Sequence, residues 1–276
     1  MTDRVWLITG ASRGFGAEIS KAVLAAGEKL VATARTMQGL EHLGTNGSLF
    51  TAVLDVTDEP QVKDVVHAAV AHFGHVDVLV NNAGISLLGA LEESSADEVE
   101  RLYRTNVFGL LNVTRAVLPS MRQRRSGHVI NLSSIAGYSA YEGFGVYSST
   151  KFAVEGLSEA LHIELRPLGI RVTVVEPGFF RTDILDTTKS LIETAAQIGD
   201  YAETAGAMRA AVPGYNHRQP GNPTKLAEAL LQVVNAADPP LRLPLGSDTL
   251  ARMAEKNARI ERETSTWRAL AASTDF

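Results

Sequence analysis

Short apolar runs alternate with stretches of helical periodicity along most of this chain. The apolar runs predict strands at residues 5–9, 29–34, 49–54, 76–80, 128–132 and 170–175. The segments between them are long enough to hold the crossover helices that parallel strands require. The pattern therefore predicts an α/β fold, a Rossmann-type doubly wound parallel β-sheet, in a single domain over residues 1–276.

The pattern weakens after the sixth strand. Between residues 183 and 222, scattered apolar positions stand among many Ala and Thr. A segment of this kind past the carboxyl end of a strand is expected to be mobile and to form a substrate lid. A helix is predicted at 223–236, and a strand at 241–245 contains a proline that favours a sheet edge. Residues 247–276 are predicted to form a polar helix to about Arg262 and then a loose tail.

Composition narrows the range of functions. The chain has 276 residues, 45% hydrophobic content and a net charge of -5, so it can bury one full core and lacks a strongly basic surface for nucleic acid or anionic membrane. It has no cysteine, which excludes disulfides, thiolate metal ligands and a cysteine nucleophile. The residues after Met1 enter an apolar strand without the long apolar region of a signal peptide, and no run of about 18 apolar residues is present. We expect a cytoplasmic protein that needs no metal and has no nucleic-acid or membrane partner.

A glycine-rich turn follows the first strand and precedes a helical pattern. This order presents backbone N–H groups and a helix N-terminus to a phosphate. Glycines at a strand end are also common as plain turn residues, so the spacing alone leaves both interpretations open. A phosphate site at this turn would be formed by Gly10, Ser12, Arg13, Gly14, Phe15 and Gly16.

The ends of the second and third strands indicate which dinucleotide would bind. Ala34 stands where many dinucleotide folds carry an acid for the ribose 2′-hydroxyl, and Arg35 follows it. With Arg13, this guanidinium suits a 2′-phosphate, although both arginines could be solvated surface residues. We therefore predict NADP(H) in preference to NAD(H). Asp55 and Val56 follow the third strand, where an adenine edge could be held, and Asp55 could also cap the turn into the next helix.

The strongest chemical signal lies between residues 131 and 151. Tyr147 and Lys151 are four residues apart in a helical pattern, so they share one helix face. A fixed ammonium favours the phenolate and lowers the pKa of the phenol, so Tyr147 could work as a general acid or base. Ser134 follows a strand, where its hydroxyl could hold a substrate oxygen. A lone Tyr-x-x-x-Lys is common on helices, and Asn106 could make only an ordinary hydrogen bond to a strand.

Together these motifs resemble the short-chain dehydrogenase/reductase family, and the resemblance covers about residues 3–246. Phe15 departs from the Ile or Leu that is usual in the family, so we expect a local packing difference without loss of binding. A weaker likeness over residues 243–248 is to the 17β-hydroxysteroid and retinol dehydrogenases. The motifs that carry the main resemblance are Thr9-Gly-x-x-x-Gly-x-Gly16, Asn81-Asn-Ala-Gly84, Asn106, Ser134, Tyr147-x-x-x-Lys151 and Pro177-Gly178.

The resemblance implies a role for each site residue. Tyr147 is similar to the family's general acid/base, and Lys151 to the residue that lowers its pKa and holds the nicotinamide ribose. Ser134 would orient the carbonyl oxygen, and Asn106 would anchor a proton-relay water. The adenosine side would contact Asp55, Val56, Asn82, Ala83 and Gly84. The nicotinamide carboxamide would be fixed by Pro177, Gly178 and Thr182.

The resemblance also implies an activity and an assembly. The expected enzyme transfers hydride between NADP(H) and a carbonyl or secondary alcohol of a fairly apolar small molecule. Family members pair the long helices that here contain Asn106 and Tyr147, so we expect a homodimer or homotetramer. The alternative is an NADP(H)-sensing binding module with little or no turnover, suggested by the polar C-terminal helix.

Overall fold

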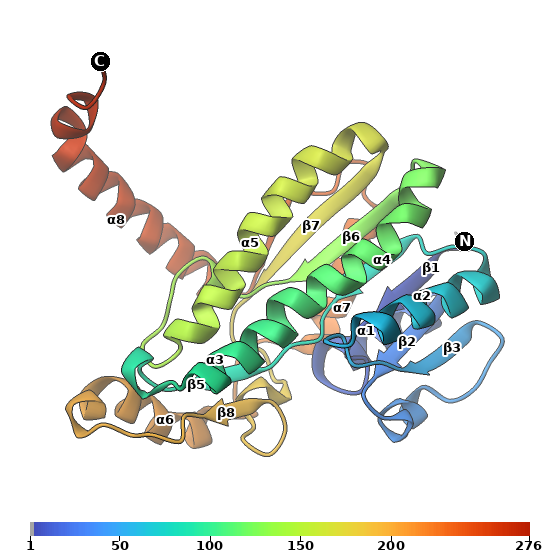
Figure 1. The fold of residues 1–276 in the computed structure, drawn as a ribbon, viewed down its shortest axis with the longest axis horizontal. Coiled ribbons are helices and arrows are strands. Elements are labelled where there is room, and N and C mark those ends of the chain that lie inside the picture. The colour runs from blue at the N-terminus through green and yellow to red at the C-terminus, as the bar shows by residue number, and fades with distance from the viewer. Residues whose placement is uncertain (1–2) are drawn as a thin grey trace.

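The computed structural model describes residues 3–276. Met1 and Thr2, which belong to the stretch on which the signal peptide expectation rests, lie outside the described residues. Within these residues seven parallel strands form one sheet in the order β3-β2-β1-β4-β6-β7-β9 (Figure 1). The order reverses between β1 and β4, which opens a crevice at the carboxyl ends of the strands. The predicted Rossmann-type fold is confirmed. The strands are β1 (Val5–Ile8), β2 (Lys29–Ala34), β3 (Leu49–Val53), β4 (Val78–Asn81), β6 (Gly127–Leu132), β7 (Ile170–Pro177) and β9 (Arg242–Leu245).

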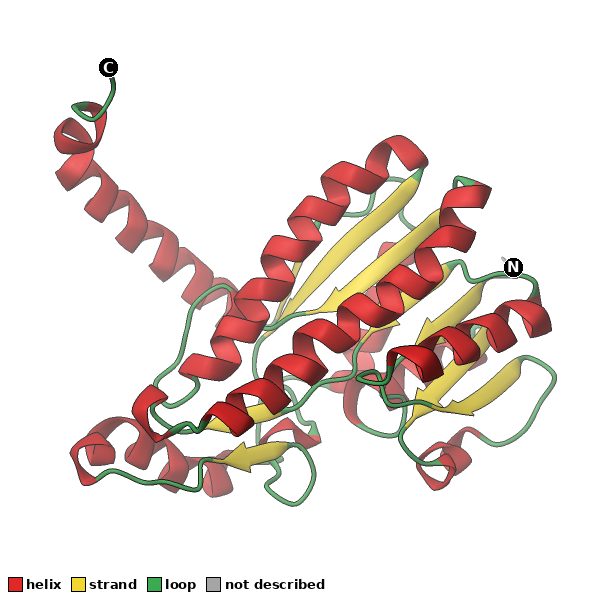
Figure 2. Ribbon diagram, viewed as in Figure 1, coloured by secondary structure: helices red, strands yellow, loops and turns green. Residues whose placement is uncertain are grey.

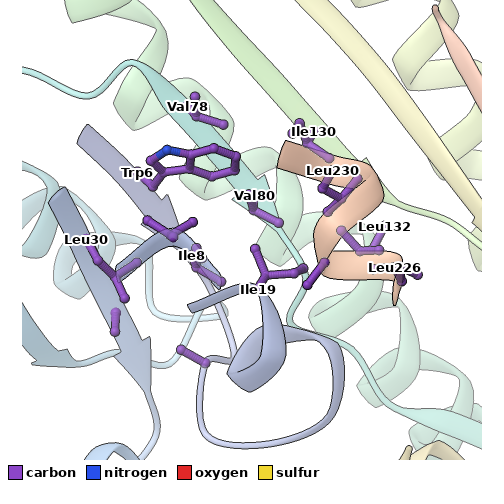
Figure 3. Close-up of a cluster of buried hydrophobic side chains, with 14 of the residues drawn as sticks. Trp6, Ile8, Ile19, Leu30, Val78, Val80, Ile130, Leu132, Leu226 and Leu230 are labelled. Carbon is purple, nitrogen blue, oxygen red and sulfur yellow. The ribbon is translucent and has the colours of Figure 1, made fainter. Parts of the chain in front are cut away.

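Helices cover both faces of the sheet (Figure 2). The helices α1 (Gly14–Ala25) and α7 (Pro223–Asn235) pack on one face, against Trp6, Ile8 and Ile130 (Figure 3). The other face packs against α2 (Glu59–Phe73), α4 (Gly109–Arg124) and α5 (Gly145–Leu165). Because both faces are buried, the strands are nearly continuous apolar runs, which made them easy to predict. Short 3-10 turns occur at η1 (Met37–Leu43), η2 (Leu91–Glu93), η4 (Ile135–Gly137) and η5 (Arg166–Leu168).

The long helix predicted at 96–122 contains an irregular turn. Helix α3 (Ala96–Tyr103) begins at a capping box between Ser95 and Glu98. It leads through one π-helical turn, η3 (Arg104–Phe108), into α4. Such turns insert an extra residue into a helix and are frequent at functional sites. This one carries Asn106.

The weak pattern at 183–222 conceals several short elements. Strand β5 (Ser86–Leu88) pairs in parallel with β8 (Leu191–Glu193), and three residues are too few for a recognisable strand pattern. The remaining elements are η6 (Asp183–Leu185), η7 (Gly199–Tyr201), the π turn η8 (Ala202–Gly206) and α6 (Ala207–Tyr215). A separate apolar cluster of Leu88, Phe144, Leu185, Leu191 and Val212 holds this segment over the crevice.

The C-terminal helix α8 (Ser247–Ala272) contacts the body through Arg252 and Lys256 in its first part, and its second part projects away from the molecule (Figure 1). The loose tail predicted after Arg262 is therefore wrong, because the helix continues to Ala272. Its base is attached to the body by Asp248, whose carboxylate accepts a 2.8 Å hydrogen bond from the Phe179 N–H. No helix within residues 3–276 has the length and apolar character needed to cross a membrane.

Candidate active site

One cavity of about 1020 Å³ occupies the crevice at the carboxyl ends of the strands. All but two of the residues predicted from the sequence line it. The exceptions are Gly16 and Asn106, which lie directly behind its wall. The predicted residues that line it are Gly10, Ser12, Arg13, Gly14, Phe15, Arg35, Asp55, Val56, Asn82, Ala83, Gly84, Ser134, Tyr147, Lys151, Pro177, Gly178 and Thr182.

The glycine turn is shaped to accept a phosphate. Gly10 has φ +67°, and a Cβ on Gly16 would lie 2.2 Å from the carbonyl oxygen of Gly10, so both positions require glycine. The Asn82 amide donates hydrogen bonds to the carbonyl oxygens of Thr9 (2.8 Å) and Gly10 (3.0 Å), which fixes the turn. Helix α1 begins here without a side-chain cap, so its first N–H groups face the cavity unblocked.

Phe15, the one departure from the family pattern, has a packing explanation. Its ring meets the Phe180 ring edge to face at 5.3 Å between centroids. Phe180 is 7% exposed and belongs to the core cluster on the α1 side of the sheet. The Phe15 side chain therefore fills space between α1 and the segment after β7. This contact is the local packing difference that we expected from Phe15.

The two predicted cations lie in different environments. Arg35 is exposed at the end of β2 and lines the cavity, beside the buried Ala34. Arg13 instead reaches the 183–222 segment, where its Nη2 donates to the Lys189 carbonyl (3.1 Å) and the Ser190 hydroxyl (3.0 Å). In this conformation Arg13 connects the glycine turn to the 183–222 segment.

Asp55 organises the turn into α2, which was the alternative to an adenine contact in the sequence analysis. Its Oδ1 accepts hydrogen bonds from the N–H (2.9 Å) and hydroxyl (2.8 Å) of Thr57, while Asp58 caps α2 by accepting from the Gln61 N–H. Asp55 also lines the cavity with Val56, so the structural position is compatible with an adenine contact.

Tyr147 and Ser134 both line the cavity and are hydrogen-bonded to each other. Burial raises the pKa of Tyr147 to about 12, and its hydrogen bond with Ser134 acts in the opposite direction. In the chain alone the pKa of Tyr147 is therefore raised, because desolvation of the phenol outweighs the hydrogen bond with Ser134. The Lys151 Nζ lies 5.8 Å from the centroid of the Tyr147 ring and donates a 2.8 Å hydrogen bond to the Leu132 carbonyl. Burial lowers the pKa of Lys151 to about 8 and Glu155 opposes that shift.

Asn106 makes the ordinary helix-to-strand contact that the sequence left open. Its Oδ1 accepts from the Ile85 N–H (2.9 Å), and its Nδ2 donates to the Ile85 carbonyl (2.9 Å) and the Thr150 hydroxyl (3.1 Å). The π turn supplies the geometry for these bonds, which hold the start of β5 against α5.

Several residues around the site were not predicted from the sequence. Tyr141 and Phe144 line the cavity and pack in one apolar cluster with Tyr147. Phe179, Ile184 and Leu185 line the same side, as the predicted lid requires. The buried acid Glu155, one helical turn beyond Lys151, was also missed, although its i+4 spacing was a detectable signal.

The fold and this site define an oxidoreductase built on a Rossmann-type sheet. A family model described as short chain dehydrogenase matches residues 4–192, and the chain belongs to that family. It is 34% identical over 274 residues to "Oxidoreductase BOA17" of Botryotinia fuckeliana, covering 98% of this chain and 99% of the relative. It is 38% identical over 247 residues to the 3-ketodihydrosphingosine reductase of Bacteroides thetaiotaomicron, covering 89% of both chains.

Solved structures give the same result. A short-chain dehydrogenase from Streptomyces avermitilis superposes with a TM-score of 0.91 and 39% identity, covering 99% of this chain and 100% of that one. A serine dehydrogenase complexed with NADP+ has a TM-score of 0.74 and 30% identity, over 87% and 94% of the two chains. A Burkholderia phymatum family member in complex with NAD has a TM-score of 0.83 and 26% identity, over 95% and 97%.

Proposed function

We propose that this protein is an NADP(H)-dependent oxidoreductase that transfers hydride between the nicotinamide and a carbonyl or secondary alcohol of a fairly apolar small molecule. The observation that carries the proposal is the meeting of Ser134, Tyr147 and Lys151 in the cavity that the glycine turn also lines. A hydroxyl, a phenol and an ammonium beside a phosphate-binding turn are the groups that carbonyl reduction with a dinucleotide needs.

The cavity residues fit a nicotinamide dinucleotide. The uncapped start of α1 and the tight glycine turn suit the pyrophosphate, and Arg35 suits a 2′-phosphate. Asp55, Val56 and the segment 82–84 line the cavity and would contact the adenosine, while Lys151 would hold the nicotinamide ribose. Pro177, Gly178 and Thr182 would fix the carboxamide. One relative is solved with NADP+ and another with NAD, so the preference for NADP(H) rests on Ala34 and Arg35 of this chain.

When bound, the cofactor supplies the hydride that forms the new C–H bond. Ser134 orients the substrate oxygen, and Tyr147 donates its proton to that oxygen as negative charge develops there. The raised pKa keeps the phenol protonated at neutral pH, so the chain alone is prepared for reduction. The Lys151 ammonium stabilises the phenolate that remains after transfer. Asn106 would hold the water that returns a proton to it.

The walls of the cavity favour an apolar substrate. Tyr141, Phe144, Phe179, Ile184 and Leu185 line the side next to Tyr147. We assign residues 183–222 as the substrate lid, because this segment contributes two of these side chains and covers the cavity. The similarity to a 3-ketodihydrosphingosine reductase supports a ketone on an apolar chain as the substrate class.

Assembly through α4 and α5 is part of the proposal. Phe108, Phe152 and Ile163 are 52%, 42% and 72% exposed on or beside these two helices. Exposed apolar side chains on the helices that the family pairs support a homodimer or homotetramer.

The test is oxidation of NADPH against a panel of ketones and aldehydes, with Tyr147→Phe as the decisive variant. Loss of a general acid is expected to lower kcat by about 100-fold or more. Tyr201→Phe is the matched control, because Tyr201 lies outside the cavity with its hydroxyl bonded to Glu92. If the Tyr147→Phe enzyme keeps most of its activity, Tyr147 is not the general acid. Cofactor binding without turnover on any carbonyl or alcohol would favour the alternative of an NADP(H)-sensing module.

A further inference from the structure

A buried group of acids lies behind Lys151, on the side away from the cavity. Glu155 follows Lys151 by one turn of α5 and is 5% exposed, and Glu176 of β7 is completely buried. Arg242 of β9 connects them, since its Nη1 donates 2.5 Å hydrogen bonds to Glu155 Oε2 and to Glu176 Oε1. Its Nη2 binds Glu159, whose side chain is 52% exposed.

The two buried carboxyl groups face one another. Among residues 3–276, Glu155 Oε1 and Glu176 Oε2 have no hydrogen-bond partner of normal geometry, and the Ser133 hydroxyl lies beside Glu155. The two carboxyl groups are within hydrogen-bonding reach of each other. Ionised carboxylates only accept hydrogen bonds, so two of them in contact repel, whereas one shared proton makes the same contact a hydrogen bond.

The surrounding charges favour retention of that proton. Three carboxyl groups, Glu155, Glu159 and Glu176, gather around Arg242, and Lys151 is the nearest buried cation on the cavity side. With one proton on the pair, the two remaining carboxylates balance the positive charges of Arg242 and Lys151. Without that proton, the same set of groups carries one excess negative charge. Beyond Arg242, this excess charge acts on the ammonium of Lys151, because a buried site screens charges poorly.

We propose that Glu155 is a positioning residue that holds Lys151 in its charged form. The pair of Glu155 and Glu176 shares one proton, and loss of that proton adds the negative charge that stabilises the Lys151 ammonium. The inference rests on the proposed function, because it deepens the role of Lys151 in that site. Glu155 acts through Lys151 and does not touch the substrate.

The direction of the effect follows from two neighbouring pKa values. Burial raises the pKa of Glu155 to about 7, with Glu176 adding to the shift and Ser133 and Arg242 opposing it. Burial lowers the pKa of Lys151 to about 8. As the pH rises, Glu155 loses its proton first, and the new negative charge strengthens the hold of Lys151 on its own proton. Lys151 therefore stays charged to a higher pH than it would beside a neutral residue.

The other polar and charged groups near the pair are few. Ser133 lies beside Glu155 and directs its hydroxyl at the Lys151 carbonyl oxygen, 3.5 Å away. Lys256 of α8 lies over the Tyr138 ring at 5.0 Å, with Arg242 at 6.0 Å from the same ring. None of these groups replaces the carboxylate of Glu155, so a neutral amide at that position isolates its effect.

The first experiment titrates Lys151 directly, by following the resonance of its isotope-labelled ε-carbon with pH and assigning it with Lys151→Arg. Glu155→Gln should lower the titration midpoint of Lys151 by about one pH unit. Glu164→Gln is the matched control: Glu164 is an exposed acid on the same helix and takes no part in the group around Arg242, so the midpoint should not move. Equal midpoints in the wild type and Glu155→Gln would overturn the inference.

The second experiment compares kcat/KM for carbonyl reduction between about pH 6 and about pH 9. A protonated Glu155 and a glutamine carry the same charge, so the two enzymes should diverge only as Glu155 ionises. The ratio of wild-type to Glu155→Gln activity is expected to grow by about tenfold over this range, and the ratio for the control Glu164→Gln is expected to stay constant. A constant Glu155→Gln deficit at every pH would show a purely structural role and refute the inference. An inactive wild type would contradict the proposed function, and the resonance titration would still decide the inference.

Discussion

Burial sets the chemistry of Tyr147 and Lys151 in opposite directions. It raises the pKa of the phenol to about 12 and lowers that of the ammonium to about 8, because it disfavours the charged form of each. The gap between these values leaves the phenol protonated and most of Lys151 charged at neutral pH. A proton donor and a charge stabiliser thus coexist in one cavity, each held in the protonation state that carbonyl reduction needs.

Cofactor choice is a prediction about Arg35. The wild type is expected to bind NADPH at least about tenfold more tightly than NADH, a difference of about 1.4 kcal/mol. Arg35→Ala should erase most of that ratio, because it removes the cation at the end of β2. Fluorescence titration of each cofactor measures the ratio.

Arg13→Ala is the informative comparison for this prediction. Arg13 donates to Lys189 and Ser190 of the lid, so its loss should weaken both cofactors by similar factors. An unchanged NADPH to NADH ratio in Arg35→Ala would refute the assignment of the 2′-phosphate site.

Residues close together in sequence were the ones that sequence could predict. Tyr147 and Lys151 share a helix turn, and the glycines share one loop, so spacing alone reports their geometry. The partners of Arg242 lie 66 and 87 residues away, and its pairing with Glu176 and Glu155 depends on how β7, β9 and α5 pack. No local pattern contains that information.

At the scale of elements, the proposed lid at 183–222 is bound by one buried acid outside it, Glu93. Glu93 of η2 accepts hydrogen bonds from the N–H groups of Ala90 (2.7 Å) and Ile198 (2.8 Å), and it pairs with Arg209 of α6. The hydrogen bond from Arg209 lowers the pKa of Glu93 to about 2, against the effect of burial, and the two backbone bonds assist. Thr194 accepts a further bond from Arg209 at 3.0 Å. The lid is therefore fastened to the loop after β5 by charge as well as by apolar packing.

Glu93→Gln is expected to loosen the lid. The amide cannot neutralise Arg209, whose side chain is only 11% exposed, so the buried cation loses its partner. KM for an apolar ketone should rise by about three- to tenfold, with faster proteolysis within 183–222. Steady-state kinetics and limited proteolysis measure the two effects.

The exposed lid residue Glu203 provides the control, since Glu203→Gln removes an acid from the same segment without touching Arg209. Wild-type KM and proteolysis rates in Glu93→Gln would mean that apolar packing alone fastens the lid. Because the native pKa of Glu93 lies below its ordinary value of 4.5, this stabilisation is complete above about pH 4.5 and is lost as the pH falls toward 2.

At the scale of the whole molecule, the sequence predicts the parallel sheet and its crossover helices, but not the short strands β5 and β8 or the length of α8. Long apolar runs separated by crossover helices dictate a parallel sheet, and its order follows the rules of such folds. Strands β5 and β8 were not predicted, because each is three residues long and the two are separated by more than a hundred residues of chain. Helix α8 was underestimated because it buries little of its surface, so its polar sequence resembles a tail.

The acid stability of the whole fold is expected to depend on His128, which lies in β6 between β4 and β7. It is 4% exposed, and its Nε2 is 2.9 Å from the Thr173 hydroxyl. Burial lowers the pKa of His128 to about 4, with Arg171 and Arg4 adding to the shift. The unfolded chain takes up a proton near pH 6.5 and the folded chain does not, so the stability is present above 6.5 and falls as the pH drops toward 4.

The free energy of unfolding should fall by about 3 kcal/mol over that interval from this one group. His128→Gln keeps a polar group near Thr173 but cannot take up the proton, so its stability should decline less than that of the wild type between pH 6.5 and pH 4. Exposed His67 on α2 supplies the control, since His67→Gln should follow the wild-type curve. Urea unfolding at a series of pH values measures all three proteins. Parallel curves for the wild type and His128→Gln would contradict this prediction. They would mean that His128 takes up its proton inside the folded sheet, although burial disfavours the imidazolium there.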